Sequence, residues 1–141
     1  EIVPVAAGRC VVKLDEKKAK AKTARWQGIA EAAAKQSRRG MIPGVAEVMS
    51  MKEAVAYAGS MDVKLIPYEL AEDMTKTKEI ISGIRPGESV AVFIGPEGGF
   101  EEKEIGAAME SGVIPITLGK RILRTETAGL TVLAWLMYHL T

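Results

Sequence analysis

The sequence is poor in the residues that bind metals or form covalent cross-links, with one cysteine, Cys10, and one histidine, His139. A single cysteine excludes a disulfide within the chain. With only one histidine besides, the usual zinc ligand sets cannot be assembled, so we expect no metal site. The sequence also lacks an apolar run long enough to cross a bilayer, and we therefore expect no membrane partner.

The beginning of the chain lacks an initiator methionine and the charged and apolar regions of a signal peptide. Residues 1–5 have the pattern of a β-strand instead, so we expect the sequence to be part of a longer protein, or of one with a disordered beginning. Its 141 residues suit one domain, residues 1–141, with a core of its own. The composition, 48% apolar and 26% charged, is typical of a soluble globular protein and agrees with a cytoplasmic location.

The net charge of +1 conceals an asymmetry between two parts of the chain. Residues 1–40 have a balance of +6, whereas residues 41–141 have a balance of −5. A basic segment favours contact with a polyanion. The lysines at 17, 18, 20 and 22 are equally compatible with the solvated face of a helix.

Short apolar runs alternate with helical patterns, which predicts an α/β domain with a largely parallel sheet. We expect strands at Ile2–Ala6, Val11–Leu14, Val63–Pro67, Ser89–Ile94 and Val113–Leu118. We expect helices at Asp15–Ser37 with Asp15 as N-cap, and at Ser50–Ala58, Thr75–Ile84, Glu101–Ser111 and Thr125–Leu140. The strand at Ser89–Ile94 is apolar on both faces, which is typical of a central parallel strand.

Two of the expected helices carry distinctive apolar surfaces. In the first, apolar residues recur at helical spacing and predict a buried face: Trp26, Ile29, Ala30, Ala33 and Ala34. The last helix is apolar almost all round, and such a helix belongs in the core, at a subunit interface, or in both.

The run Gly-Pro-Glu-Gly-Gly-Phe at 95–100 directly follows the strand Ser89–Ile94. In open α/β sheets, ligands bind at the carboxyl ends of the strands, so this loop is a candidate site. It matches neither glycine-rich phosphate motif, and Glu97 would repel a phosphate. A ligand with hydroxyls or positive charge would suit it better. The alternative is a tight turn that merely connects strand and helix.

A second candidate loop, residues 118–128, follows the next strand. Arg121 and Arg124 flank an apolar pair, Ile122-Leu123. We expect Thr125 to cap the helix that follows. The negative charge of Glu126 would interact favourably with the positive end of the dipole of this helix. In an alternative interpretation, one or both arginines bond backbone carbonyls and hold the loop.

At these two loops the sequence resembles the bacterial 16S ribosomal RNA (uracil N3) methyltransferases. The resemblance is carried by Gly-Pro-Glu-Gly-Gly-Phe with Glu104 downstream, and by the run Leu-Gly-x-Arg-Ile-Leu-Arg-Thr-Glu-Thr-Ala. It extends to Arg9, Arg25-Trp26, Gln36-Ser37, Arg39 and Pro43, and so covers nearly the whole chain.

The resemblance implies a fold of the SPOUT superfamily, an open, mostly parallel sheet with helices on both faces and a C-terminal trefoil knot, which is rare among folds. It implies a homodimer formed through the knot region and the last helix. The family's N-terminal RNA-binding barrel domain is absent from this sequence. The implied cofactor is S-adenosylmethionine, held by Pro67, Gly95, Pro96, Glu97, Gly98, Gly99, Leu118, Gly119, Ile122, Leu123 and Arg124.

The implied reaction methylates a ring nitrogen of a uridine, which becomes a good nucleophile only after it loses its proton. A cation beside the base would stabilise the resulting anion. Arg124 is the first candidate for this catalytic role and Arg9 the second. The candidate proton acceptors are Glu126, Glu97 and water.

The implied partner is 16S rRNA or the small ribosomal subunit. Candidate RNA-binding residues are Arg9, Arg25, Arg38 and Arg39. The chain departs from the family pattern at Lys35, where an acid is usual, and at Arg38, where glycine is frequent.

Other functions remain open at this point. The target could be a transfer RNA base or a ribose 2′-hydroxyl. The chain could also be a non-catalytic, knotted RNA-binding dimer module, which intact cofactor loops argue against. An ordinary α/β nucleotide-binding domain would need a phosphate motif that the sequence lacks.

Overall fold

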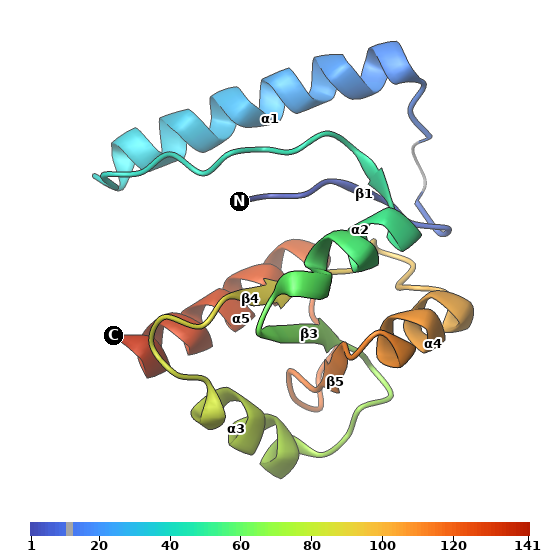
Figure 1. Ribbon diagram of the computed structural model, residues 1–141, viewed down its shortest axis with the longest axis vertical. Coiled ribbons are helices and arrows are strands. Elements are labelled where there is room, and N and C mark those ends of the chain that lie inside the picture. The colour runs from blue at the N-terminus through green and yellow to red at the C-terminus, as the bar shows by residue number, and fades with distance from the viewer. Residues whose placement is uncertain (11–12) are drawn as a thin grey trace.

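The computed structural model describes residues 1–10 and 13–141. A parallel sheet lies at its centre and contains β3 (Val63–Pro67), β4 (Val90–Val92) and β5 (Ile114–Ile116), in the order β4-β3-β5 (Figure 1). Both neighbours pair with β3 in parallel. The predicted α/β class with a parallel sheet is therefore confirmed.

The prediction that Ser89–Ile94 forms the central strand is wrong, because β3 occupies that position. Leu65 and Ile66 of β3 are completely buried, whereas the residues of β4 are half-buried. The segment around β4 is apolar on both sides for another reason. Its Phe93 packs into one hydrophobic cluster and its Val92 against the other, so both of its faces are covered.

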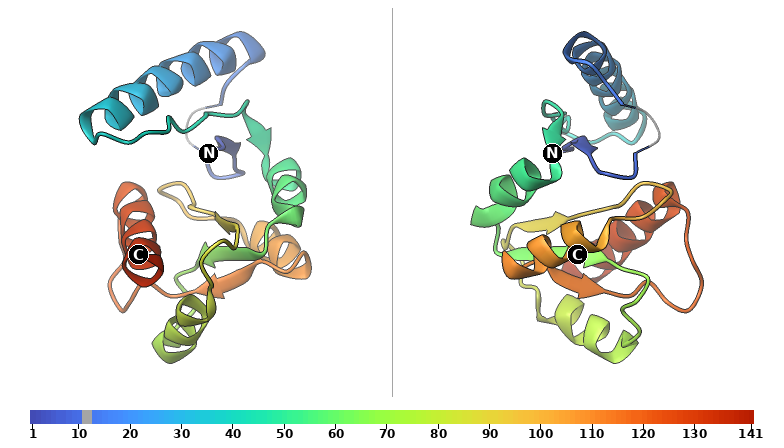
Figure 2. Two further views of the ribbon diagram at one scale, coloured as in Figure 1. Left: turned by 60° about the vertical axis from the view of Figure 1, so that its left-hand side comes forward. Right: turned by 90° about the vertical axis from the view of Figure 1, so that its right-hand side faces the viewer.

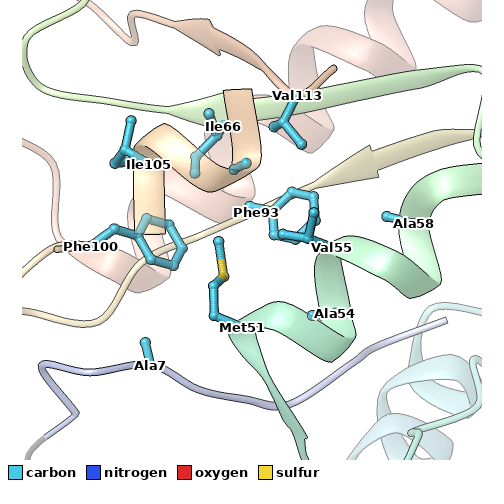
Figure 3. Packing of buried hydrophobic residues seen from close by; sticks show 11 residues of the cluster. Ala7, Met51, Ala54, Val55, Ala58, Ile66, Phe93, Phe100, Ile105 and Val113 are labelled. Carbon is cyan, nitrogen blue, oxygen red and sulfur yellow. The ribbon is translucent and has the colours of Figure 1, made fainter. Parts of the chain in front are cut away.

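Helices cover both faces of the sheet: α2 (Met51–Tyr57), α3 (Met74–Gly83), α4 (Glu102–Glu110) and α5 (Thr125–Leu140). Successive residues of a strand point to opposite faces. Ile66 accordingly packs with residues of α2 and α4, as Figure 3 shows, and Leu65 packs with residues of α3 and α5. Burying such a side chain stabilises the fold by about 2 kcal/mol.

The sequence before α2 forms a separate layer. A short parallel pair joins β1 (Val5–Ala6) to β2 (Met49–Ser50), and Ile2 bridges to Val45. Ser50 also caps α2 through a capping box with Glu53, and the short helix η1 (Ala58–Ser60) follows α2. In the predicted strand Val11–Leu14, residues 11 and 12 lie outside the described residues, and residues 13 and 14 belong to no strand.

The long helix α1 (Glu16–Gln36) begins as predicted, because the Asp15 carboxylate accepts a 2.8 Å hydrogen bond from the Lys18 N–H. Its predicted buried face is confirmed in part, and Trp26 is half-buried. Ala30 and Ala34 are buried, but Ile29 is 56% exposed and Ala33 is exposed. The reason is that α1 lies alongside the extended chain that returns to β2 and away from the sheet (Figures 1 and 2).

The Gln27 side chain connects α1 to this returning chain. Its amide nitrogen donates to the Pro43 carbonyl oxygen at 3.1 Å, and its amide oxygen accepts from the Val45 N–H at 2.7 Å. The two bonds satisfy both ends of the side-chain amide. Gln27 therefore gives α1 a defined position without a large apolar interface.

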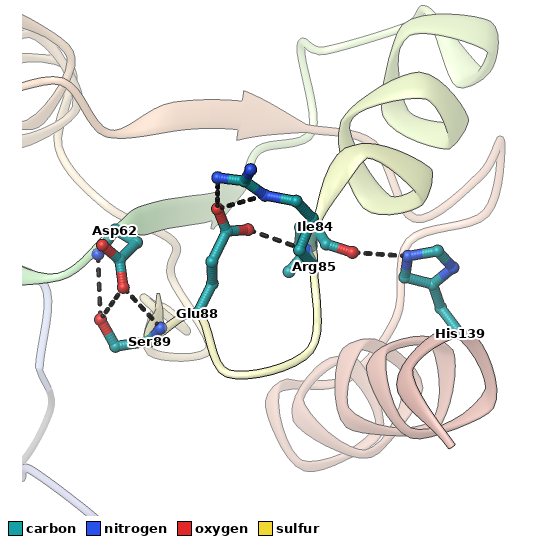
Figure 4. A network of polar contacts seen from close by, with 6 residues as sticks. All are labelled: Asp62, Ile84, Arg85, Glu88, Ser89 and His139. Carbon is teal, nitrogen blue, oxygen red and sulfur yellow. Dashed lines mark hydrogen bonds and ion pairs between the residues drawn. The ribbon is translucent and has the colours of Figure 1, made fainter.

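Polar contacts close the sheet at the amino ends of its strands (Figure 4). One Asp62 carboxylate oxygen accepts from both the N–H and the hydroxyl of Ser89, at 2.8 and 2.7 Å. These bonds, together with the positive charge of Arg85, lower the pKa of Asp62. The His139 ring lies 2.8 Å from the carbonyl oxygen of Ile84, which connects α5 to the end of α3.

Among the described helices, none has the length and apolar character that a membrane span requires.

Candidate functional site

A cavity of about 630 Å³ opens at the carboxyl ends of the three central strands. Segments that follow β3, β4 and β5 line it, at residues 67–69, 94–100, 117–126 and 128. Its size is within the usual range for small-molecule sites. Its place is where open parallel sheets bind ligands.

All residues that were predicted to hold a cofactor line this one cavity: Pro67, Gly95, Pro96, Glu97, Gly98, Gly99, Leu118, Gly119, Ile122, Leu123 and Arg124. The catalytic candidates Arg124 and Glu126 line it as well. These residues come from three separate segments of the sequence, and the fold brings them together. Their roles in binding and catalysis stay predictions.

The first loop is shaped by close backbone packing. A Cβ atom on Gly95 would lie 3.1 Å from the ring of Phe100, so glycine allows the ring to fold back over the loop. Gly99 has a φ of +72° and its N–H donates to the Pro96 carbonyl oxygen at 2.8 Å, which closes a tight turn. Phe100 is buried and fixes the loop to the core.

The second loop is joined directly to the first. The Thr125 hydroxyl donates to the Gly95 carbonyl oxygen at 3.0 Å. The prediction that Thr125 caps the last helix is wrong, because Arg124 occupies the N-cap position, where its side chain forms no capping hydrogen bond. The Thr125 hydroxyl is engaged by the other loop, so it serves the cavity wall instead of the helix end.

Charged side chains of both signs surround the cavity. Arg121, Arg124, Glu97 and Glu126 are exposed, and within the described residues none of the four forms a hydrogen bond or an ion pair through its side chain. The alternative in which the arginines hold the loop by bonding carbonyls is therefore not supported. The cationic groups stay available to a ligand or substrate.

Arg9, the second catalytic candidate, lies outside the cavity wall. Its Nη1 donates to the Gly98 carbonyl oxygen at 3.0 Å, and a Cβ on Gly98 would lie 3.4 Å from that of Arg9. The neighbouring Gly8 N–H donates to the Glu104 carboxylate at 2.8 Å. Residues 8 and 9 therefore bind the first loop and the start of α4 without lining the cavity.

The remaining RNA-binding candidates do not line the cavity. Arg25 is exposed on α1, and Arg38 and Arg39 are exposed just beyond its end. Arg38 has a φ of +56°. The Arg38 and Arg39 N–H groups donate to the carbonyls of Lys35 and Ala34, which completes a Schellman motif with arginine at the usual glycine position.

Lys35, the other departure from the family pattern, pairs with Glu31 one turn earlier on α1, with 2.7 Å between Nζ and the carboxylate. The sequence reasoning missed two buried polar residues at the cavity, Thr117 in its wall and Thr77 behind it. A threonine at a buried position of an otherwise apolar helix face was the available signal for Thr77. In the described part of the chain, no three acidic, histidine or cysteine side chains gather as a metal site would require.

These features define a class of protein: an α/β domain in which loops after parallel strands form a cavity of small-molecule size, with neither glycine-rich phosphate motif in those loops. Comparison with known proteins gives the family. RNA methyltransferase domains match residues 1–137, and the chain belongs to this family.

The chain is 39% identical to the ribosomal RNA small subunit methyltransferase E of Bacillus subtilis over 97% of its own length and 55% of that protein's. It is 33% identical to the protein of the same name from Mycobacterium bovis, over 90% of this chain and 48% of that one. The chain thus spans about half the length of these curated relatives.

Among solved structures, the fold matches a ribosomal RNA small subunit methyltransferase E of Neisseria gonorrhoeae bound to S-adenosylmethionine. The TM-score is 0.83 and the identity is 37%, over 99% of this chain and 54% of that one.

Proposed function

We propose that this chain is the catalytic domain of an S-adenosylmethionine-dependent methyltransferase that acts on N3 of a uridine in 16S ribosomal RNA. The observation that carries the proposal is the single cavity lined by all of the predicted cofactor residues. The names of its relatives support the RNA substrate, and the cofactor bound in the Neisseria structure supports the identity of the ligand.

The chemistry of the cavity wall fits this cofactor. The carboxylates of Glu69, Glu97 and Glu126 suit a ligand with a positive charge, and they would repel the phosphates of a nucleotide. Apolar side chains of Leu118, Ile122 and Leu123 offer a surface for the adenine ring. Ile122 is 87% exposed in the described chain and would be covered by the ligand or a partner.

When bound, the cofactor supplies an electrophilic methyl group on a sulfonium sulfur. The chain's own residues have to position the uracil and manage its N3 proton. Arg124, at the cavity edge and with no partner within the described residues, stabilises the uracil anion. Glu126 lines the same cavity and accepts the proton.

The RNA is held through its backbone by basic residues outside the cavity. Arg25, Arg38 and Arg39 are exposed and reach solvent along α1 and its end. N3 lies on the Watson–Crick edge, so the target base has to be unpaired or swung out before it can enter. Shape and phosphate contacts then select a structured region of the 16S rRNA or of the small subunit.

We also propose that the chain forms a knotted homodimer, and the exposed face of the last helix supports the dimer. Val132 and Leu136 face the sheet and are buried, but Leu130, Leu133 and Met137 form an apolar stripe that is 69%, 56% and 64% exposed. Such a stripe needs a cover in solution. We assign it to the same helix of a second copy, with α5 passing through the loop before it as in the SPOUT trefoil knot.

Two measurements test the proposed function. Calorimetric titration with S-adenosylmethionine is expected to give saturable binding at about one site per chain. Incubation of the chain with unmethylated small subunits and labelled cofactor, followed by nucleoside mass spectrometry, is expected to give N3-methyluridine, lost in Arg124→Ala. Methylation of a ribose hydroxyl or of transfer RNA would replace the proposed substrate by another, and absence of cofactor binding by folded protein would overturn the enzyme assignment.

A further inference from the structure

Two buried threonines connect α3 to the wall of the cavity. Thr77 is 2% exposed and Thr117 is 5% exposed, and they are the buried polar residues of the described chain. Thr77 lies in the first turn of α3, and Thr117 lies directly after β5, where the second loop begins. Their interaction spans 40 positions of the sequence.

The Thr77 hydroxyl group has two partners. Its oxygen accepts a 3.0 Å hydrogen bond from the Thr117 N–H, and its own proton is donated to the Asp73 carbonyl oxygen at 3.3 Å. Asp73 is the N-cap of α3 and accepts from the Lys76 N–H through its side chain. The hydroxyl is therefore oriented by a capped helix turn.

Thr117 extends the chain of hydrogen bonds into the cavity. Its hydroxyl oxygen accepts from the Gly119 N–H at 3.2 Å. Gly119 has a φ of +111°, which is only one of the many backbone conformations open to glycine. The hydrogen bond from its N–H to Thr117 helps to select this conformation. Thr117, Leu118 and Gly119 all line the cavity.

We infer that Thr77 is a positioning residue for the cofactor site, which acts through Thr117 to hold the turn at 117–119 in its ligand-binding shape. The inference rests on the proposed function for the identity of the ligand. Thr77 does not line the cavity and so does not contact the ligand there. It affects ligand affinity by raising the fraction of molecules in which the turn at 117–119 is correctly formed. Apparent affinity falls in proportion to that fraction.

The test compares Thr77→Val with Thr77→Ser. Valine keeps the shape of threonine but leaves the buried Thr117 N–H without an acceptor, whereas serine keeps the hydroxyl. We expect the dissociation constant for S-adenosylmethionine to rise about tenfold in Thr77→Val and to stay near the wild-type value in Thr77→Ser. Ile81→Val is the matched control, because Ile81 is buried in the same helix but its aliphatic side chain forms no hydrogen bond with the turn.

Amide hydrogen exchange of the ligand-free protein separates this inference from the proposed function. Thr77→Val is expected to speed exchange at Thr117 and Gly119 selectively, and Ile81→Val is not. Unchanged exchange at these two amides overturns the inference, whether or not the wild type binds the cofactor. Equal loss of affinity in Thr77→Val and Ile81→Val, matched to their loss of stability, also overturns it. If the wild type does not bind S-adenosylmethionine but the selective exchange effect is present, the positioning role stands and the proposed ligand is wrong.

Discussion

The Arg9 guanidinium donates a 3.0 Å hydrogen bond to the carbonyl oxygen of Gly98, across 89 positions of the sequence. This contact places the basic N-terminal segment directly behind the first loop of the cavity. Arg9 was a candidate for stabilising the uracil anion, yet its side chain does not line the cavity. The bond indicates that Arg9 supports the loop and that Arg124 is the better catalytic candidate.

Replacing Arg9 by alanine is expected to weaken cofactor binding. The bond is exposed, and the loss of an exposed hydrogen bond from a charged donor costs about 1 kcal/mol, which corresponds to roughly a fivefold rise in the dissociation constant. Calorimetric titration with S-adenosylmethionine measures the dissociation constants of the variant and the wild type. Lys52→Ala removes the same charge from an exposed position of α2 and serves as control. Equal effects of the two variants would show that only net charge matters.

The sequence allowed most of the fold to be predicted, because its elements are local patterns. The helix that begins after Asp15 and the strand Val63–Pro67 depend on a cap and on an apolar run, and both were predicted. The order of the strands was not, because Ser89–Ile94 is as apolar as a central strand. Apolar cover on both faces, which β4 has, does not depend on having neighbours on both edges.

The cavity was predicted through its loops, but its supports were not. Gly95–Gly99 and Leu118–Leu123 carry a recognisable residue pattern. The bonds from Arg9 to Gly98, from Thr125 to Gly95 and from Thr117 to Thr77 each join residues at least 30 positions apart. Such pairs have no local signature, so only the folded chain reveals them. For the same reason Thr125 was assigned to the nearby helix end.

A substitution at Gly119 tests the shape of the second loop. Because its φ is +111°, alanine at this position is expected to lower the free energy of unfolding by about 1 to 2 kcal/mol and to weaken cofactor binding. Gly106→Ala is a matched control within α4, where a Cβ would meet no atom within 4 Å. It is expected to raise stability by about 1 kcal/mol through helix propensity. Urea unfolding measures the change in the free energy of unfolding for both variants. An unchanged free energy in Gly119→Ala would contradict the expected backbone strain of alanine at this position.

Arg38 offers a test in which stability and RNA binding change in opposite directions. Its left-handed backbone costs about 1 kcal/mol that glycine would not incur. Arg38→Gly is therefore expected to stabilise the end of α1 while weakening binding to 16S rRNA. The slope of log affinity against log salt concentration should become less steep by about one unit, which corresponds to the loss of one phosphate contact. Arg38→Lys keeps the charge and the backbone strain. Unchanged RNA affinity in Arg38→Gly would remove Arg38 from the proposed interface.

The bond between Asp62 and Ser89 predicts a dependence of stability on pH (Figure 4). The Ser89 hydroxyl and N–H lower the pKa of Asp62 below its ordinary value, which is about 4. A lowered carboxyl pKa stabilises the folded state above the pKa of the unfolded chain, and this stabilisation is lost as the pH falls through the folded value.

Ser89→Ala removes the hydroxyl and should bring the pKa of Asp62 back toward its ordinary value. The variant is expected to be less stable than the wild type at neutral pH, and the difference should shrink as the pH falls below about 4. Urea unfolding at a series of pH values measures the difference. Ser82→Ala is the control, because the Ser82 hydroxyl bonds the Glu79 carbonyl oxygen and no carboxylate. A stability difference between Ser89→Ala and the wild type that stays constant with pH would show that Ser89 does not affect the pKa of Asp62.

The apolar stripe of α5 predicts the assembly state. Leu133 lies at its centre, between Leu130 and Met137, and is 56% exposed in the single chain. Glutamate at this position would place a charge against the same helix of the second copy, where desolvation opposes it. We expect the wild type to sediment as a dimer and Leu133→Glu as a folded monomer. Met109→Glu on α4 changes a residue of similar exposure, 49%, away from the stripe and should leave the dimer intact. Loss of the dimer in both variants would point to a general effect of charge, and a dimeric Leu133→Glu would place the interface on another surface.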